Sequence, residues 1–459
     1  MTNEELYQQI QLEVLERIKP QKGEEDLLKK KFEEVVRKIK LVLTKSNIQA
    51  KIELTGSFSR DTWLSGNRDI DIFVIMPYDS TVSPNDLLQE IKKEIKYRWV
   101  RKHAKHPYLY AETDGIVVEI LPCYEYKPNR ELRSAVDRSP SHTRFIAENL
   151  PVGSNDEVRL LKQFMHGVGT YGAEIKIHGF SGYLVELMII HFGGKFINVL
   201  KNATTLLQEP IVFKENLVVD KSKFEDDPVV VIDPTDDNRN VASALKDKAL
   251  DNFIVAAKKY LKNPSLEFFF PNKMIINGKN IREMKSCPLE YIAILHKEPD
   301  IADDILWGQI RKFEKSIQSF LKTEDMDPIY VDSIISNEEI MTVIVTTEFH
   351  TKSTRWINGP PIVLDRDDEF LQKYSNDNTV IFGPSILEGR WKVFAKQEKR
   401  TLQELIQIGL ETNKISQPSH LNLKHHTIYS REELLEKITN DSDKMRFLYT
   451  LLKGKPIFL

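Results

Sequence analysis

Cysteine is nearly absent from this chain: only Cys123 and Cys287 occur among 459 residues. Two cysteines so far apart provide neither a disulfide framework nor a four-ligand zinc site, and their scarcity favours a reducing compartment. The sequence also lacks a basic, apolar amino-terminal segment and any apolar run long enough to cross a membrane. These absences predict a soluble, cytoplasmic protein without a membrane partner.

An excess of charge of one sign is missing as well. The 65 Lys and Arg nearly balance 68 Asp and Glu, so the formal net charge is -3. This balance argues against a uniformly basic nucleic-acid binder, although local basic grooves stay compatible with it. The pattern GxxxxGK[ST] does not occur, so ATPase chemistry has no P-loop. Hydrophobic residues make up 41% of the chain, which is enough apolar material for two to four domains.

Hydrophobic periodicity predicts a mixture of helices and strands. Helical spacing runs up to Pro20, and Asp114-Gly115 is a typical hairpin turn between two apolar runs. The segments 265–272, 329–335 and 339–349 are predicted as strands, and Pro360-Pro361 as a loop. Further helices are predicted over residues 24–44, 83–99, from 154 onward, 179–194, 400–410 and within 430–452, and further strands over 50–57 and 68–77.

Two aspartates lie inside the best predicted strand of the first hundred residues, "RDIDIFVIMP". Residues two apart on a strand point the same way, so Asp69 and Asp71 share one face while Ile70 and Ile72 share the other. The two carboxylates, about 6 to 7 Å apart along the strand, repel one another. A divalent cation offsets that repulsion, and Mg²⁺ prefers carboxylate oxygens together with substrate phosphates. An amphipathic strand with two acids on its solvated face is, however, common.

The residues just before this strand suit phosphate binding. Gly56 and Ser57 stand where the preceding strand turns into a short predicted helix. A glycine lets a phosphate approach the backbone, and the serine hydroxyl with the following N–H groups can donate to it. Arg60, one helical turn further, can add a charged fork to the same phosphates. Taken singly, Gly-Ser is a turn and Arg60 a surface residue; together with the aspartates they place a triphosphate beside a metal.

This arrangement resembles the fingerprint of the nucleotidyltransferase superfamily related to DNA polymerase beta, in which Gly-Ser precedes Asp-x-Asp by about this interval. The resemblance implies a third carboxylate on a neighbouring strand, and Glu119 in "VVEILPCY" is the matching position. The family usually has Asp there; Glu is one methylene longer, which moves the carboxylate by about 1.5 Å. In this chemistry two metal ions activate the attacking 3′ hydroxyl and stabilise the leaving pyrophosphate.

Further motifs narrow the resemblance to one family, the archaeal-type (class I) CCA-adding enzymes, from near residue 5 to the end. Such an enzyme adds C, C and A to the 3′ end of tRNA from CTP and ATP without a template, uses Mg²⁺, reads the acceptor and T-arm of tRNA as shape, and usually forms a homodimer. The motifs that carry the resemblance are "GSFSRDTWLSGNRDIDIFVIMP", "EILPCY", "AVDRSPSHTRFI", "EVRLLKQFMHGVGTYGAE", "GFSGYLVELMIIHFG", "VVIDPTDDNRNVASAL", "FFFP", "NGPPI" and "EGRWKV".

The resemblance implies an α+β multidomain fold. Its catalytic head would resemble polymerase beta and contain a mixed sheet, followed by a helical neck and an α/β body and tail. On this pattern the chain divides into a head (1–150), a neck that recognises the base (151–262), a first part of the body (263–325), a tRNA-binding tail (326–400) and a second part of the body (401–459).

The same resemblance assigns roles to single residues. Asp69, Asp71 and Glu119 would be catalytic and hold the metal, and the nucleotide-binding residues would be Ser57, Arg60, His142, Lys162, Tyr171 and, for the base, Arg239.

The residues themselves allow plainer interpretations. Lys162 lies on an amphipathic predicted helix, where a solvated lysine is usual. His142 precedes a predicted helix and fits a cap region, and Tyr171 fits simple packing. Arg239 can pair with Asp233, Asp236 or Asp237 while it also serves the base.

Two other functions stay open on the sequence. A poly(A) or oligoadenylate-type polymerase would share the carboxylates but not "DPTDDNRN" or "GTYGAE". A non-catalytic RNA-binding relative would have lost the site, which the intact Asp69, Asp71, Ser57 and Arg60 disfavour. Salt-sensitive contacts with tRNA are expected, and no residue is assigned to them individually. The candidates are Lys352, Arg355, Trp356, Arg390, Lys392 and His425.

Overall fold

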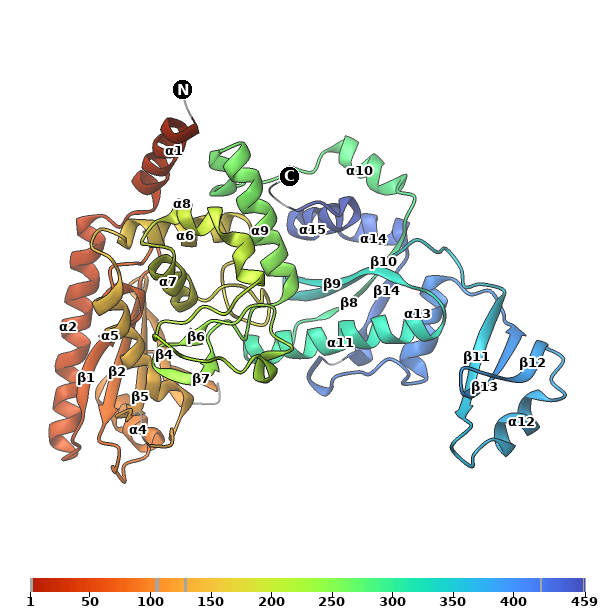
Figure 1. Cartoon of the computed structure of the whole chain (residues 1–459), viewed down its shortest axis with the longest axis horizontal. Helices are drawn as coiled ribbons and strands as arrows, with labels where there is room; N and C mark the ends of the chain where they lie inside the picture. Colours follow the sequence, from red (N-terminus) through yellow and green to blue (C-terminus); the bar gives the residue numbers. More distant parts are fainter. Residues whose placement is uncertain (1–2, 104–106, 128–129, 422, 457, 459) are drawn as a thin grey trace. The chain divides into compact units, whose positions relative to one another are not determined.

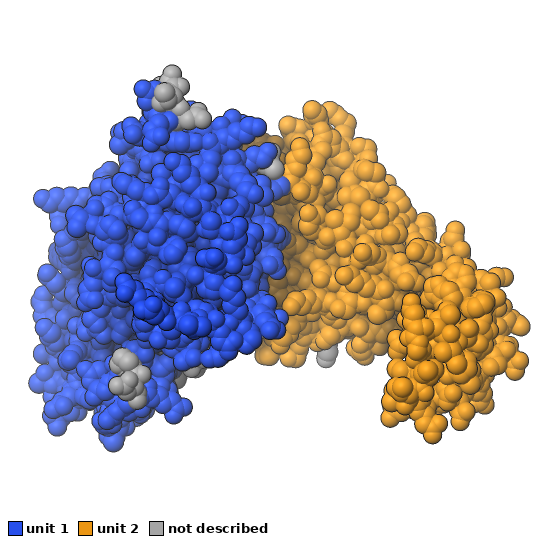
Figure 2. Space-filling view, viewed as in Figure 1, with its two compact units in different colours: residues 1–272, 456–459 blue, residues 273–455 orange. Residues whose placement is uncertain are grey.

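The computed structural model describes residues 3–103, 107–127, 130–421, 423–456 and 458. The chain folds into two compact units, residues 1–272 with 456–459 (unit 1) and residues 273–455 (unit 2), which Figure 2 colours separately. Each unit contains both helices and sheets (Figure 1). Within the described ranges, none of the helices has the length and apolar character needed to cross a bilayer.

The first part of unit 1 is built on a five-stranded sheet in the order β1-β2-β5-β4-β3. β2 pairs in parallel with β5, and every other neighbouring pair is antiparallel. The elements of this part are α1 (Asn3–Ile18), α2 (Lys22–Lys45), β1 (Lys51–Thr55), α3 (Gly56–Ser59), β2 (Asp69–Met76), α4 (Pro84–Glu94), β3 (Val100–His103), β4 (Pro107–Thr113) and β5 (Ile116–Tyr124).

One face of this sheet is packed against α2 and α4, because alternate strand residues are apolar. Ile70, Ile72 and Val118 are fully buried on this face. They share a core with residues of α2 such as Val35 and of α4 such as Ile91. The intervening residues of β2 and β5 therefore point to the opposite face, which is where the acidic residues fall.

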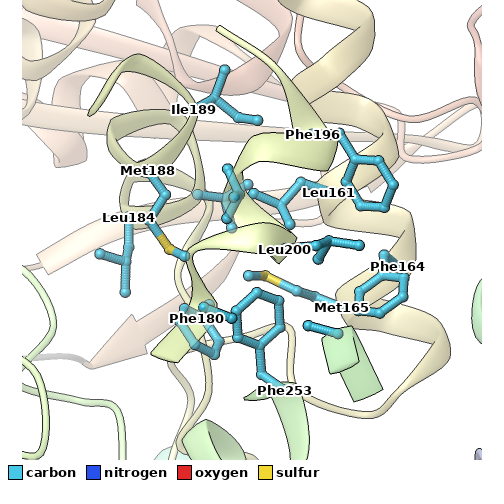
Figure 3. Close-up of a cluster of buried hydrophobic side chains, with 14 of the residues drawn as sticks. Leu161, Phe164, Met165, Phe180, Leu184, Met188, Ile189, Phe196, Leu200 and Phe253 are labelled. Carbon is cyan, nitrogen blue, oxygen red and sulfur yellow. The ribbon is translucent and has the colours of Figure 1, made fainter. Parts of the chain in front are cut away.

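The second part of unit 1 is mainly helical. Figure 3 shows buried side chains of α6, α7, α8 and α9, among them the fully buried Phe164, packed together in its core. The elements of this part are α5 (Ser139–Asn149), α6 (Asn155–Gly167), α7 (Gly182–His191), α8 (Phe196–Lys201), β6 (Ile232–Asp233), β7 (Asp236–Asn240) and α9 (Asp247–Lys262).

Unit 2 contains a four-stranded sheet in the order β14-β8-β10-β9 and a separate three-stranded sheet in the order β11-β13-β12. Its elements are α10 (Gly278–Lys285), β8 (Glu290–Lys297), α11 (Asp303–Thr323), β9 (Pro328–Ser336), β10 (Glu339–Thr346), β11 (Thr354–Pro361), α12 (Asp368–Tyr374), β12 (Val380–Leu387), β13 (Arg390–Lys396), α13 (Leu402–Glu411), β14 (Thr427–Tyr429), α14 (Arg431–Lys437) and α15 (Ser442–Lys453).

The predicted α+β multidomain class is confirmed by these mixed sheets and helices. The predicted domain boundaries at 150, 262, 325 and 400 stay predictions. Two local predictions are wrong. Residues 265–272 form no strand: Leu266–Phe268 is a 3₁₀ turn, begun by Ser265, whose hydroxyl accepts from the Glu267 N–H. The run of three phenylalanines is apolar because Phe268 and Phe269 pack on Phe164, not because it belongs to a sheet.

Pro360 and Pro361 do not form the predicted loop, since both close strand β11. The strand tolerates them because it lies at the edge of its sheet, where a missing N–H breaks no ladder on the outer side. The pairing with β13 also shifts register between Asn358 and Pro361, so the ladder is irregular where the prolines lie.

Candidate active site

The parallel pairing of β2 with β5 places three acidic residues on one face of the sheet. Asp71 is the register partner of Glu119, and Asp69 lies opposite Val117. Ile70, Val118 and their alternate neighbours point into the core on the other side. Asp69 is exposed, whereas Asp71 and Glu119 are half-buried. The sequence prediction that two neighbouring strands present Asp69, Asp71 and Glu119 together agrees with this placement.

Tyr110 of β4 continues this row on the other side of Glu119. It is the antiparallel register partner of Glu119, so both side chains lie on the same face. Burial raises the pKa of the Tyr110 phenol, and the charges of Glu112, Glu119 and Asp69 raise it further. Tyr110 therefore stays a neutral hydroxyl beside the carboxylates, and the sequence analysis did not identify it.

The electrostatics of the acidic face disfavour two full negative charges without a counter-ion. Although Asp69 reaches solvent, partial loss of hydration raises its pKa. Burial, followed by the charge of Asp69, raises the pKa of Asp71 to about 6, and the nearby Arg60 only partly offsets this. A bound cation would remove the penalty that both carboxylates carry.

Gly56 fits closely against Asp71. Its φ of 72° lies in the left-handed region. A Cβ added to Gly56 would lie 1.8 Å from Asp71 Oδ2, so no other residue fits while the carboxylate keeps its place. Gly56 and the half-buried Ser57 open the four-residue helix α3 directly after β1, as the sequence predicted.

The donor set of the acidic face suits a hard divalent cation, since carboxylate oxygens are the ligands that Mg²⁺ prefers. As the side chains are placed, no three His, Cys, Asp or Glu among the described residues stand close enough to enclose an ion. The strand register thus fixes the shared face of Asp69, Asp71 and Glu119, while their side-chain rotamers are not gathered around one point.

Arg60 is held beside this face by a buried glutamate that the sequence analysis missed. Its Nε lies 2.9 and 3.1 Å from the two carboxylate oxygens of Glu186, and its Nη1 donates to Thr143 Oγ1 at 3.0 Å. Glu186 belongs to α7 and is fully buried. The signal in the sequence was an acid inside the otherwise apolar run "GYLVELMII", since a buried carboxylate needs a charged or hydrogen-bonding partner.

Lys162 joins the same cluster, and its interpretation as a solvated surface lysine is wrong. Only 3% of its side chain is exposed. Its Nζ donates to the backbone oxygen of Thr62 at 2.9 Å and to Thr62 Oγ1 at 3.2 Å, and lies 3.7 Å from Glu186 Oε1. Burial lowers the pKa of Lys162 to about 8, against the opposing charge of Glu186. Helical periodicity missed this burial because the neighbouring loop, not another apolar face, covers the side chain.

Tyr171 lies next to Lys162. A Cβ added to Gly182 would come within 3.0 Å of the Tyr171 hydroxyl and 3.9 Å of Lys162 Nζ, so both groups approach the start of α7. The Tyr171 ring packs against His166 with the ring centroids 4.2 Å apart. Tyr171 therefore packs, as its residue type allows, and also brings a hydroxyl to the cationic cluster.

His142 and Arg239 share one carboxylate. His142 Nε2 and Arg239 Nη1 each lie 2.8 Å from Asp233 Oδ2. Burial alone would raise the pKa of Asp233, but the hydrogen bond from His142 and those from Thr235 hold it below its usual range. The predicted pairing of Arg239 with an acid is confirmed for Asp233. The expectation that His142 precedes its helix is wrong, because His142 lies within α5.

Helices α5 and α7 connect this pair to the cationic cluster. On α5, His142 contacts Asp233 while the next residue, Thr143, accepts from Arg60. On α7, Tyr183 stacks on His142 with centroids 4.2 Å apart, and Glu186, one turn later, binds Arg60. The two groups of predicted nucleotide-binding residues are thus connected through contacts of α5 and α7.

Two of the basic candidates of unit 2, Arg355 and Lys392, make local ion pairs. Arg355 Nη1 lies 2.8 Å from Glu324 Oε2, and Lys392 pairs with Glu388. Trp356, 47% exposed, packs on Phe394 with centroids 5.1 Å apart. Their contacts with tRNA stay a prediction.

Comparison with known proteins places this site in a class. Residues 18–149 match the family model described as a nucleotidyltransferase domain, residues 156–270 that of the second domain of tRNA nucleotidyltransferase, and residues 289–430 that of the C-terminal domain of the CCA-adding enzyme. With its mixed sheet and acidic face, the protein is a nucleotidyltransferase.

Relatives of nearly the full length define the family. A CCA-adding enzyme of Pyrobaculum aerophilum is 33% identical over 85% of this chain and 90% of its own. One of Methanosarcina acetivorans is 34% identical over 85% and 86%. The chain belongs to the family of CCA-adding enzymes. A solved structure of Cid1, an RNA terminal uridylyl transferase, covers 60% of this chain and 100% of its own at 15% identity, but its TM-score of 0.46 is too low to carry an argument.

The contact between Gly56 and Asp71 predicts the effect of a single methyl group. In Gly56→Ala, the added Cβ forces the Asp71 carboxylate to move, so nucleotidyl transfer should fall by about 100-fold, as for a displaced catalytic group. Gly66→Ala is the matched control, because Gly66 also has a left-handed φ, 87°, but no atom within 4 Å of an added Cβ. Both variants pay a similar backbone cost, so equal activity losses would contradict the contact.

Proposed function

We propose that this chain adds C, C and A to the 3′ end of tRNA from CTP and ATP, without a nucleic-acid template, and releases pyrophosphate. The placement of the acidic face beside the buried cations Arg60 and Lys162 is the observation that carries the proposal. The substrate follows the printed names of the full-length relatives, which are CCA-adding enzymes.

In this proposal Asp69, Asp71 and Glu119 hold divalent metal, with Mg²⁺ as the ion. Enzymes of the nucleotidyltransferase class generally use divalent metal ions. When bound, the metal activates the terminal 3′ hydroxyl of the tRNA and neutralises charge on the triphosphate. Glu119 of β5 is the register partner of Asp71 on β2. Tyr110 is its register partner on the adjoining strand β4.

The triphosphate is assigned to groups that follow β1, to Lys162 of α6 and to Tyr171 beyond this helix. Ser57 and the first N–H groups of α3 donate to phosphate oxygens beside Gly56. Arg60 and Lys162 supply positive charge, and Tyr171 supplies a hydroxyl. Fixed donors of this kind position the α-phosphorus for attack and cost little reorganisation during the reaction.

Arg239 is assigned to the base. A guanidinium can donate to cytosine O2 and N3, or to adenine N1 when the base shifts. The bond to Asp233 holds Arg239 Nη1, while 33% of the side chain is exposed and free to meet a base. His142, fixed by the same carboxylate and stacked on Tyr183, braces that group. The choice between C and A then depends on how the tRNA end shapes the pocket.

We propose that the reaction takes place in the cytoplasm. We assign binding of the acceptor and T-arm to the tail, residues 326–400, through the A-form backbone and 2′ hydroxyls rather than sequence. The proposal includes a homodimer. Light scattering of the purified protein measures the molar mass and so tests this oligomeric state.

Nucleotide incorporation on three truncated tRNAs tests the proposed function. With CTP and ATP supplied separately, tRNA ending at position 73 or 74 should accept only CMP, and tRNA ending at position 75 only AMP. Addition should stop after A. A ladder extending beyond three nucleotides would indicate a poly(A)-type polymerase instead, and no incorporation in the presence of Mg²⁺ would contradict enzymatic activity.

Glu119→Ala tests the third carboxylate. Loss of a metal ligand should lower kcat/KM for CTP addition at least about 100-fold. The control is Glu90→Ala on α4, where a half-buried glutamate pairs with Lys93, and it should retain full activity. If Glu119→Ala adds nucleotides at the normal rate, Glu119 does not belong to the site.

A further inference from the structure

Glu186 occupies an unusual position for a charged side chain. It is fully buried on α7, between the apolar neighbours Val185 and Leu187, which are buried as well. Transfer of an isolated carboxylate out of water is costly unless it is paired and hydrogen-bonded. An apolar residue would suit the packing of this helix at least as well, so the carboxylate calls for another explanation.

The polar contacts described for the Glu186 carboxylate are with the cations Arg60 and Lys162 and with the hydroxyl of Thr62. Arg60 Nε lies 2.9 Å from Oε2 and 3.1 Å from Oε1. The Thr62 hydroxyl donates to Oε1, and Lys162 Nζ lies 3.7 Å from the same oxygen. Because Thr62 Oγ1 also accepts from Lys162, the three side chains form one hydrogen-bonded unit around the carboxylate.

The charges of this unit do not cancel. Arg60 and Lys162 carry two positive charges and Glu186 one negative charge, so one positive charge remains in a poorly hydrated place. Arg159 of α6 also lies near Lys162, but its charge is balanced by Asp156 and Asp61, to which its guanidinium is bonded. The unit around Glu186 therefore retains positive charge, and its geometry depends on one acid.

We propose that Glu186 is the positioning residue of the triphosphate site: it fixes Arg60 and Lys162 in place and keeps Lys162 charged, without itself touching the nucleotide. The inference rests on the proposed function, in which both cations contact the triphosphate. It adds a residue from α7 to a site otherwise assigned to α3 and α6.

The proposal makes nucleotide affinity depend on pH in a defined direction. The charged and titratable groups around Lys162 come from several elements. They are Glu186 of α7, Arg60 at the end of α3, Arg159 and His166 of α6, the helix of Lys162 itself, and Tyr171 beyond α6. Burial lowers the pKa of Lys162 to about 8 and also lowers that of His166, so His166 is neutral near pH 8, as is Tyr171, whose pKa burial raises. Lys162 is charged below its pKa, so CTP affinity should fall as pH rises through about 8.

Glu186→Gln keeps the shape of the side chain but removes its charge. The KM for CTP should rise about tenfold or more, because the hydrogen bond from Arg60 loses its charged acceptor and the ion pair with Lys162 is lost, while kcat falls less. Since the negative charge of Glu186 raises the pKa of Lys162, its removal should move the alkaline fall in CTP affinity to lower pH. A folded Glu186→Gln protein with wild-type KM and an unchanged pH profile would overturn the proposal.

Glu314→Gln is the matched control for loss of a buried carboxylate. Glu314 lies on α11, is buried, and pairs with Arg311 at 2.7 Å. This variant should leave the KM for CTP and its pH profile unchanged. If Glu186→Gln fails to fold, as judged by circular dichroism, Thr62→Val takes its place. It keeps all charges but removes the bridging hydroxyl, and should raise the KM about threefold; a wild-type KM would then overturn the proposal.

Equilibrium dialysis of CTP without tRNA separates this inference from the proposed function. A wild-type protein that binds CTP but adds no nucleotide to tRNA contradicts the proposed function. In that case the CTP affinities of the wild-type protein and of Glu186→Gln still decide the role of Glu186. A wild-type chain that adds CCA, with unchanged CTP affinity in Glu186→Gln, contradicts the role of Glu186 alone.

Discussion

The parallel pairing of β2 with β5 is the constraint on which the site depends. This register sets Asp71 beside Glu119 and commits the alternate residues, Ile70 and Val118, to the core. A slip by one residue would bury the acids and expose the isoleucines, so the core on the α2 and α4 side protects the arrangement of the acidic face. The energy of hydrophobic packing thereby maintains two neighbouring carboxylates whose mutual repulsion would otherwise favour another register.

A second level of organisation lies in two buried carboxylates, each of which binds two other side chains. Glu186 contacts Arg60 and Lys162, and Asp233 contacts His142 and Arg239. Both acids are completely buried, and each binds two predicted nucleotide contacts. Because α5 and α7 each contribute to both groups, the residues proposed to contact the phosphates and the base are linked through these two helices. Such preorganisation would lower the ordering cost when a nucleotide binds.

Much of the acidic site could be predicted from the sequence because strand periodicity and turn chemistry act locally. Alternation placed Asp69 and Asp71 on one face, and Gly56-Ser57 marked the turn into α3. Glu119 needed the family resemblance, since no local pattern shows which strand pairs with β2. Glu186, the partner of Arg60 and Lys162, was missed for the same reason: it lies 126 residues from Arg60, and only tertiary packing brings them together.

The errors in the fold have a similar origin. Phe268 and Phe269 resemble a strand by composition, but their neighbours in space are aromatic side chains from α6 and α9. Lys162 resembles a surface lysine by periodicity, but a loop from the first part of unit 1 covers it. In each case the sequence identified the local preference correctly, and a long-range contact decided the outcome.

The acidic face is tested most directly by diffraction from crystals grown with Mn²⁺ and a CTP analogue that cannot react. The anomalous signal of Mn²⁺ should lie about 2 Å from carboxylate oxygens of Asp69 and Asp71, with Glu119 on the same ion or its neighbour. A metal bound by other residues, with these three side chains turned away from it, would contradict the account.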